Sequence, residues 1–293
     1  MNGLSVATLS PKDLAEVVGV SESSIKRWVD AGLISVSRTA GGHRRIAVSE
    51  ALRFIRSRRM RIERPDRLGI PDLAETPSTD AKRLSADFLF NLLESGYTDQ
   101  ARRAITASFS AGASAAELFD GPITGALERI GRIWKSEQRG ILVEHSATAS
   151  IIEGIGQLSG LLPDSEETAP LAVGGAPDRD PHILPSLMAS VVAAEAGWRT
   201  INLGPATPFH TFRDAAEEHE PDLIWIAAKS RVPRNAWEEL VALTSDLAAS
   251  GTVVALGGHA VVGAAVRWPK GVHVLTSMSD LSGLMANLRP HRR

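Results

Sequence analysis

The chain has 293 residues, of which 43% are hydrophobic and 23% charged, an ordinary composition for a globular protein of two or three domains. It has no cysteine, which excludes disulfides, thiolate metal sites, a cysteine nucleophile and a thioether-held chromophore. No apolar run is long enough to cross a membrane and no secretory signal opens the chain, so we expect a cytoplasmic protein.

The net charge of −2 conceals an asymmetry along the chain. Residues 1–67 carry 13 Lys/Arg and 7 Asp/Glu, a net charge of +6, which leaves −8 on the remaining residues. This basic N-terminal region, residues 1–67, is called the head below. Its charge suits an electrostatic contact with phosphates that the acidic remainder of the chain does not share.

The head begins with two short predicted helices. Ser10 and Ser21 are helix-capping residues, and a tight glycine-containing turn separates the helices, which predicts a helix-turn-helix. Ile25 and Trp28 of the second helix face the core. The opposite side of that helix carries small hydroxyls and cations suited to a DNA major groove, namely Ser23, Ser24, Lys26 and Arg27.

A basic hairpin is predicted next. Residues 34–37 and 46–48 alternate like strands, and two glycines between them let the backbone approach phosphate closely. The run closely resembles the R-T-x-G-G-H-R wing of MerR-type transcription regulators, which implies a winged helix-turn-helix that binds double-stranded DNA. The candidate DNA-contacting residues of the hairpin are Arg38, Thr39, His43, Arg44 and Arg45.

A third helix, expected from Ser49 to about Arg61, carries five arginines and either lies along the DNA backbone or presents a solvated face. We therefore assign residues 1–67 to the DNA-binding domain. Residues 68–79, with prolines and scattered polar groups, read as a linker.

Residues 80–165 show helical spacing with short loops, which predicts a bundle of four or five helices. Trp134 is followed ten residues later by Glu144 and His145. Arg139-Gly140 between them predicts a helix end, so Trp134 would close one helix and the Glu-His pair would open the next. If one helix ran through instead, Trp134 and His145 would lie roughly 16 Å apart and could share only a large flat ligand.

Residues 169–293 alternate strands and helices, which predicts a doubly wound, flavodoxin-like sheet of five parallel strands with ligands at their carboxyl ends. Asp180 and His182 follow the first strand, and Gly257-Gly258 follow the fourth. A metal-ligating imidazole needs its other nitrogen held, and a carboxylate two residues away can hold it. The strands are expected at 171–173, 200–203, 222–228, 253–256 and 273–275.

Two motifs in these halves carry a family resemblance. The W-x9-E-H spacing resembles the helical cap of the CarH/LitR family of adenosylcobalamin-dependent, MerR-type regulators. The Asp-Pro-His sequence and the glycine pair resemble the D-x-H-x-x-G motif and the nucleotide-tail slot of cobalamin-binding domains. The resemblance implies His182 as an axial cobalt ligand. The cofactor-binding residues that it implies are Trp134, Glu144, His145, Asp180, His182, Gly257 and Gly258.

The match departs from the family at three places. Pro185 stands where the family has glycine, and residues 226–228 end the third strand without the usual serine. Lys135 stands where light-sensing members carry a histidine, and an ammonium is a poor metal ligand. Two alternatives therefore remain: cobalamin held through His182, or a slot that binds a bilin, a heme or no ligand.

These features predict a transcription regulator that acts as a homo-oligomer, a dimer or a tetramer, on an operator. Its tetrapyrrole, adenosylcobalamin or another cobalamin, would control oligomerisation and DNA binding, and the resemblance implies that the protein is a photoreceptor. We expect no enzyme, because a cobalamin-dependent mutase or methyltransferase needs a substrate barrel and too few residues follow the linker.

Overall fold

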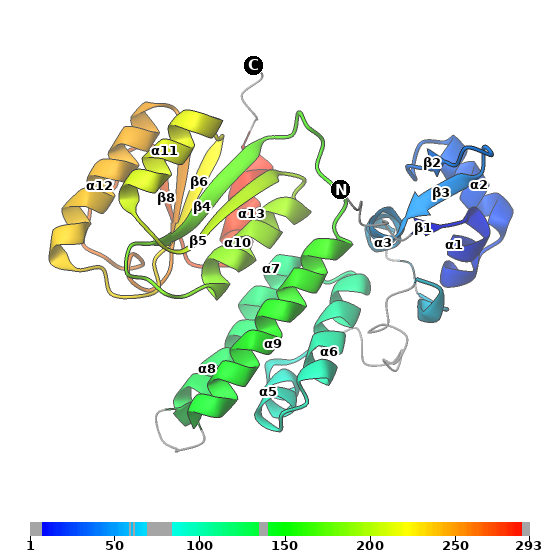
Figure 1. Ribbon diagram of the computed structural model, residues 1–293, viewed down its shortest axis with the longest axis horizontal. Coiled ribbons are helices and arrows are strands. Elements are labelled where there is room, and N and C mark those ends of the chain that lie inside the picture. The colour runs from blue at the N-terminus through cyan, green and yellow to red at the C-terminus, as the bar shows by residue number, and fades with distance from the viewer. Residues whose placement is uncertain (1–7, 59, 61, 69–83, 135–139, 289–293) are drawn as a thin grey trace. The chain divides into compact units, whose positions relative to one another are not determined.

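The computed structural model describes residues 8–58, 60, 62–68, 84–134 and 140–288 (Figure 1). The chain divides into two compact units. Residues 1–114 and 121–163 form the first unit, and residues 115–120 and 164–293 form the second. Among the described helices, none combines the length and the apolarity that a membrane span needs.

The predicted helix-turn-helix is present at the start of the first unit. Helix α1 spans Pro11–Val18 and α2 spans Glu22–Asp30. Ser10 and Asp13 form a reciprocal capping box at the start of α1, and the backbone N–H of Ser24 donates to the Ser21 side chain at 3.2 Å. Each helix therefore begins where its capping residue predicted.

A three-stranded sheet of order β1-β3-β2 completes the head, with strands Thr8–Leu9, Ser37–Arg38 and Arg44–Ala47. Strands β2 and β3 pair antiparallel and form the predicted wing. The strand predicted at residues 34–37 was misplaced, since only Ser37 of that run pairs. Ile34 is instead buried in the head core, and the Ser35 N–H donates to the Glu50 carboxylate at 2.6 Å.

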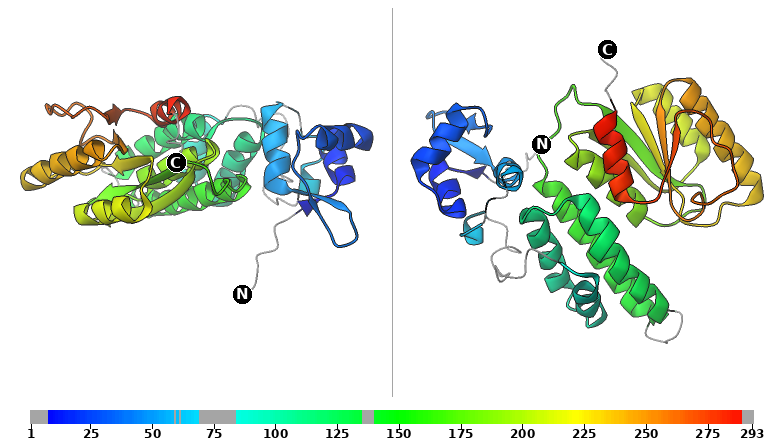
Figure 2. Two further views of the ribbon diagram at one scale, coloured as in Figure 1. Left: turned by 90° about the horizontal axis from the view of Figure 1, so that it is seen from above. Right: turned by 180° about the vertical axis from the view of Figure 1, so that it is seen from behind.

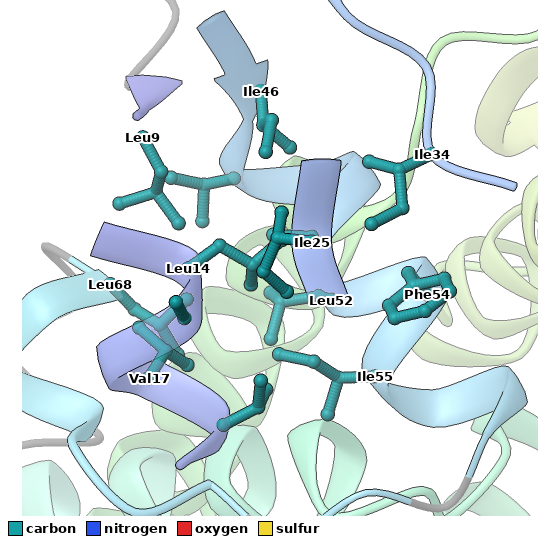
Figure 3. Packing of buried hydrophobic residues seen from close by; sticks show 14 of the residues in the cluster. Leu9, Leu14, Val17, Ile25, Ile34, Ile46, Leu52, Phe54, Ile55 and Leu68 are labelled. Atoms are coloured by element: carbon teal, nitrogen blue, oxygen red, sulfur yellow. The ribbon is translucent and has the colours of Figure 1, made fainter. Parts of the chain in front are cut away.

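The core of the head lies between α1, α2 and α3 (Figure 3). Helix α3 spans Val48–Ser57 and ends short of Arg61. Two bundle residues, Ala107 and Leu161, also pack against this core. The buried apolar side chains labelled in the figure are Leu9, Leu14, Val17, Ile25, Ile34, Ile46, Leu52, Phe54, Ile55 and Leu68.

Two of the α3 arginines make contacts that neither sequence alternative included. The Arg53 guanidinium donates to the Glu50 carboxylate and, at 3.2 Å, to the Leu33 carbonyl. The Arg56 guanidinium lies 3.6 Å from the centroid of the Phe109 ring and donates to the Ala113 carbonyl at 2.9 Å. Arg53 therefore joins α3 to the residue that follows the helix-turn-helix, and Arg56 joins α3 to the bundle.

Four helices form the predicted bundle in the first unit, with α9 packed against α6 and α8 and α5 against α8. Helix α8, whose last residue is Trp134, packs against α9, and this packing excludes one continuous helix. The prediction that Arg139-Gly140 stops a helix was wrong, because Gly140 is the first residue of α9 and glycine tolerates either helix end. Arg139 lies outside the described residues. The four helices are α5 (Ala86–Glu94), α6 (Thr98–Ser110), α8 (Thr124–Trp134) and α9 (Gly140–Leu161).

The short helix α7 (Ala115–Leu118) belongs to the second unit, although it lies within the helical stretch of the sequence. The Ala115 N–H donates to the Glu195 carboxylate at 2.7 Å. The Asp120 carboxylate accepts hydrogen bonds of 2.7 and 2.8 Å from the N–H groups of Met278 and Ser279. These polar contacts explain why residues 115–120 group with the α/β fold.

The second unit contains the predicted doubly wound sheet, with five parallel strands in the order β5-β4-β6-β7-β8. Helices α11 and α12 cover one face, and α10 and α13 cover the other (Figures 1 and 2). The elements are β4 (Leu171–Pro177), α10 (Leu184–Glu195), β5 (Arg199–Thr207), α11 (Phe209–His219), β6 (Leu223–Ala227), α12 (Arg234–Ala249), β7 (Val253–Gly257), β8 (Val272–Leu275) and α13 (Met278–Asn287).

This strand order fixes where a ligand would bind. The chain runs from β4 to β5 on one side and then returns past β4 to β6 on the other, so the direction of winding reverses at β4. Ligands of doubly wound folds bind outside the carboxyl ends of the strands at such a switch point. The loop that follows β4 carries Asp180 and His182.

Candidate functional site

The imidazole of His182 is held by Asp180 in the loop between β4 and α10. The Nδ1 atom of His182 lies 2.6 Å from Oδ1 of Asp180, and the His182 backbone N–H donates to the same oxygen at 3.1 Å. Because a carboxylate only accepts, Nδ1 carries the proton and the lone pair lies on Nε2. The Asp180 side chain is 2% exposed and that of His182 46% exposed, so the imidazole is anchored at one nitrogen.

Asp180 is itself held by the loop after β6. Its Oδ2 accepts from the backbone N–H groups of Lys229 at 2.6 Å and of Ser230 at 2.7 Å. Burial raises the pKa of Asp180, but the donors from Ser230, His182 and Lys229 outweigh it, so the pKa lies below its ordinary value. The carboxylate is therefore a fixed anion behind the imidazole.

Ser230 is a site residue that sequence reasoning missed. Its hydroxyl donates to Asp180 Oδ1 at 3.2 Å and lies 3.3 Å from His182 Nδ1. The missing serine at the end of the third strand suggested that no hydroxyl was available there. The sequence signal for this residue was a serine two positions after Ala228. That signal points to the site only when the loop after β6 is known to turn back toward Asp180.

Backbone strain and a helix start fix the position of the Asp-x-His loop. Arg179 has φ +62° and Ala206 has φ +50°, left-handed values that non-glycine residues rarely adopt and that often mark functional sites. The Ala206 N–H donates to the Asp180 carbonyl at 2.8 Å. Pro185, a departure from the family pattern, lies in the first turn of α10, where its fixed φ suits the helix.

The glycine pair after β7 has two different environments. A Cβ on Gly258, which has φ +99°, would lie 2.2 Å from the Ala228 carbonyl oxygen, so the close packing of two strand ends requires this glycine. A Cβ on Gly257 would have only the Leu275 carbonyl oxygen, at 3.9 Å, within 4 Å. Gly258 is thus explained by the fold itself.

A cobalamin-type group fits this unit at one side only. Asp180 and His182 match the requirements of an axial nitrogen ligand with its second nitrogen held. The layer between the sheet and α10 is filled by the Trp225 indole, which is 2% exposed. Asp180 and His182 therefore fit the metal of such a group, and the layer under α10 offers no space for a buried base.

The predicted upper residues lie in the first unit, whereas His182 lies in the second. Trp134 ends α8, and its side chain and Lys135 are outside the described residues. Glu144 and His145 lie in the first turns of α9, with His145 Nδ1 2.7 Å from Glu144 Oε2 and 73% of the His145 side chain exposed. The described part of the chain contains no cluster of three His, Asp or Glu groups arranged for a metal ion.

The predicted DNA-contacting residues lie together on α2 and the wing. Lys26 pairs with Glu22 at 2.8 Å, and Arg44 pairs with Asp30 at 2.7 Å. In the wing, the Gly42 N–H donates to the Thr39 carbonyl at 2.8 Å and closes the turn. The residues of this surface that are exposed or half-buried are Ser23, Ser24, Lys26, Arg27, Arg38, Thr39, His43, Arg44 and Arg45.

The chain resembles several solved structures, three of which illustrate the similarity. The monomethylamine corrinoid protein of Methanosarcina barkeri has 12% identity, covers 67% of this chain and 94% of its own, and has a TM-score of 0.49. The methanol:cobalamin methyltransferase complex of Methanosarcina barkeri has 17% identity, coverages of 74% and 87%, and a TM-score of 0.35. A cobalamin-binding protein of Desulfitobacterium hafniense has 16% identity, coverages of 70% and 98%, and a TM-score of 0.33.

At these identities and TM-scores, none of the three similarities carries a function over to this chain. A search of curated proteins finds no match. The family model described as "Helix-turn-helix domain" matches residues 8–59, which include α1, α2, the wing and α3. Residues 8–59 therefore form a helix-turn-helix domain.

Proposed function

We propose that this protein is a DNA-binding transcription regulator whose α/β unit holds a tetrapyrrole of the cobalamin type through His182. The observation that carries the proposal is the anchored imidazole at the switch point, with its Nδ1 2.6 Å from the buried Asp180 carboxylate. A helix-turn-helix domain in the same chain gives the ligand a process to control.

Different residues of the α/β unit would have different roles in ligand binding. His182 Nε2 would ligate the metal of the tetrapyrrole, and the Asp180 carboxylate keeps the imidazole in the tautomer that ligation needs. Ser230 and the N–H of Lys229 hold that carboxylate ionised. When bound, cobalamin would supply a cobalt centre to which an imidazole nitrogen can bind.

The helical unit would cover the second side of the ligand. Trp134 would stack on the ring, and Glu144 and His145 would meet its upper side, as the family resemblance implies. Ligand occupancy would change how subunits pack, and light would act through the bound ligand.

The head would bind an operator as part of a homo-oligomer, because one small helix-turn-helix module gives limited specificity. The exposed side of α2 would enter the major groove. The glycine turn of the wing would bring its backbone close to phosphate, with Arg38 and Arg45 supplying charge. The protein would act as a regulator without catalytic activity of its own.

An absorption titration of the full chain with hydroxocobalamin tests the proposal. We expect spectral changes that report nitrogen ligation of the corrinoid, and their loss in His182→Ala. The matched control is His219→Ala, which removes the last residue of α11 in the same unit. Unchanged affinity and spectrum in His182→Ala would refute the axial role of this residue.

A second candidate ligand class is heme or a bilin, because the same anchored imidazole suits heme iron. Titration with hemin and with biliverdin under the same conditions distinguishes these ligands by their absorption bands.

A DNA-binding measurement tests regulation by the ligand. A duplex selected from a random library is titrated with the protein, with and without the bound ligand. Equal DNA affinity and equal oligomeric state in both conditions would contradict ligand control.

A further inference from the structure

Toward the carboxyl ends of its central strands, the sheet face under α10 is built from small residues with Trp225 as the large exception, whereas Leu223 and Val253 of the same face lie at the strand starts. The opposite face carries the bulky side chains that pack against α11 and α12, among them Val173, Ile224 and Leu256. Because strand residues alternate between faces, their neighbours point toward α10 and α13. On the three central strands these neighbours include Ala172, Gly174, Ala227, Ala255 and Gly257, and among them stands Trp225.

The indole of Trp225 extends across the neighbouring strand. A Cβ on Gly174 of β4 would lie 2.2 Å from Cδ2, 2.4 Å from Cγ and 2.3 Å from the carbonyl oxygen of Trp225, so the missing side chain makes room for both the ring and the backbone of β6. Gly174 and Trp225 are register partners in the parallel ladder of β4 and β6. The ring therefore occupies the layer between these strands and α10.

A chain of polar contacts fixes the orientation of the ring. The indole Nε1–H donates to the Ser186 hydroxyl at 3.0 Å, and that hydroxyl donates to the Asn202 side-chain oxygen at 2.8 Å. Ser186 is fully buried. A buried indole N–H with a partner is satisfied, and protein interiors of this kind are close-packed, so the ring is a built part of the layer.

The layer under α10 lies next to the segment that carries His182. His182 stands two residues before α10, so a ligand held on its Nε2 lies at the end of the layer that α10 covers. A cobalamin that takes an imidazole from the protein as its axial ligand displaces its own lower base, a benzimidazole. Benzimidazole and indole are both fused five- and six-membered rings of closely similar size. The layer beside His182 therefore already contains one such fused ring system, the indole of Trp225.

We propose that Trp225 is a specificity-determining residue that occupies the place a displaced nucleotide base would need. The site then takes corrinoids whose lower base is absent or stays outside the sheet. This inference rests on the proposed function and deepens it, since it names the ligand class that His182 would hold.

Parallel absorption titrations of the full wild-type chain with hydroxocobalamin and with diaquacobinamide, which lacks the nucleotide base, test the inference. We expect cobinamide to bind at least as tightly as cobalamin. A wild-type protein that binds cobalamin more than roughly tenfold tighter than cobinamide would overturn the role of Trp225 while leaving the axial role of His182 intact. Spectral silence with both corrinoids would refute the proposed function, and with it the selection assigned to Trp225.

The variant Trp225→Ala gives a second measurement. Opening the layer should shift the ratio of the two dissociation constants by roughly tenfold in favour of cobalamin. The matched control is Trp198→Ala, which removes another buried indole, just before the first residue of β5 and thus at the opposite end of the strands. An unchanged ratio in a folded Trp225→Ala protein would overturn the inference, and if that variant fails to fold, the wild-type ratio decides alone.

Discussion

Nη2 of Arg44 in the wing lies 2.7 Å from Oδ1 of Asp30, the last residue of α2. This pair joins the two parts of the head that the sequence assigns to DNA. The Arg44 side chain is 26% exposed and that of Asp30 61% exposed, and an ion pair that water reaches from the Asp30 side contributes only about 1 kcal/mol. Phosphate can therefore compete with Asp30 for the guanidinium.

Replacing Arg44 by alanine should weaken DNA binding and make it less sensitive to salt. Each phosphate contact contributes about one unit to the slope of the logarithm of affinity against the logarithm of salt concentration. We expect the slope to flatten by about one unit in fluorescence anisotropy titrations. Arg213→Ala, which removes a cation from the second unit, should leave the slope as it is. An equal slope for Arg44→Ala and wild type would remove Arg44 from the phosphate contacts.

Asp180→Asn should destabilise the α/β unit in a pH-dependent way. The folded pKa of Asp180 lies below its ordinary 3.8, so its stabilising contribution is present above that value and is lost as pH falls through the folded pKa. The asparagine would also set an NH2 group or a weaker acceptor against the donors from Lys229 and Ser230. We expect a loss of about 2 kcal/mol at neutral pH, which shrinks in acid.

Urea unfolding of the wild type and of Asp180→Asn across acid and neutral pH measures this difference. Asp222→Asn provides a comparison within the same unit, because Asp222 accepts from one backbone N–H, that of Leu171, at 2.9 Å. If the difference in unfolding free energy between wild type and Asp180→Asn does not change as the pH is lowered, the negative charge of Asp180 does not contribute to stability.

Ser230→Ala should have a smaller effect than Asp180→Asn, because the two backbone donors to Asp180 remain. The lost hydroxyl contacts, 3.2 Å to Asp180 and 3.3 Å to His182, are long, and we expect at most about 1 kcal/mol of lost stability. Affinity for hydroxocobalamin should fall a few-fold, as the imidazole becomes less well oriented. Ser245→Ala, whose hydroxyl donates to a carbonyl within α12, should change neither quantity. A loss as large as that of Asp180→Asn would contradict this ranking.

Arg56→Ala should loosen the attachment of the head to the helical bundle. Its guanidinium stacks on Phe109 at 3.6 Å and donates to the Ala113 carbonyl at 2.9 Å, which together stabilise this contact by about 2 kcal/mol. Hydrogen exchange of α3 and of the end of α6 should rise in the variant. Arg58→Ala removes an exposed cation from just past the end of α3. Its guanidinium lies farther from its ring, 5.7 Å from the centroid of Phe54 within the head, so we expect a stability change of about 0.5 kcal/mol. Equal exchange in the two variants would rule out the assigned role of Arg56.

The sequence by itself determined most of the elements and their order, although it misplaced the strand at residues 34–37. Capping residues such as Ser10 and Ser21 fixed the helix starts of the head, because a helix needs partners for its first N–H groups and local spacing shows where they are. Alternating strand-length and helix-length runs in residues 169–293 were enough for the doubly wound sheet. The Asp-x-His spacing was also enough to place His182 beside Asp180, since the two side chains are only two residues apart.

The tertiary structure decided everything that depends on contacts between distant segments. The sequence cannot show that Lys229 and Ser230 close on Asp180, because 49 and 50 residues separate them and a loop conformation brings them back. It cannot show that Arg56 reaches Phe109. Least of all could it show that Trp225 lies over Gly174, because which side chain fills a layer depends on the register of two strands and the helix above them.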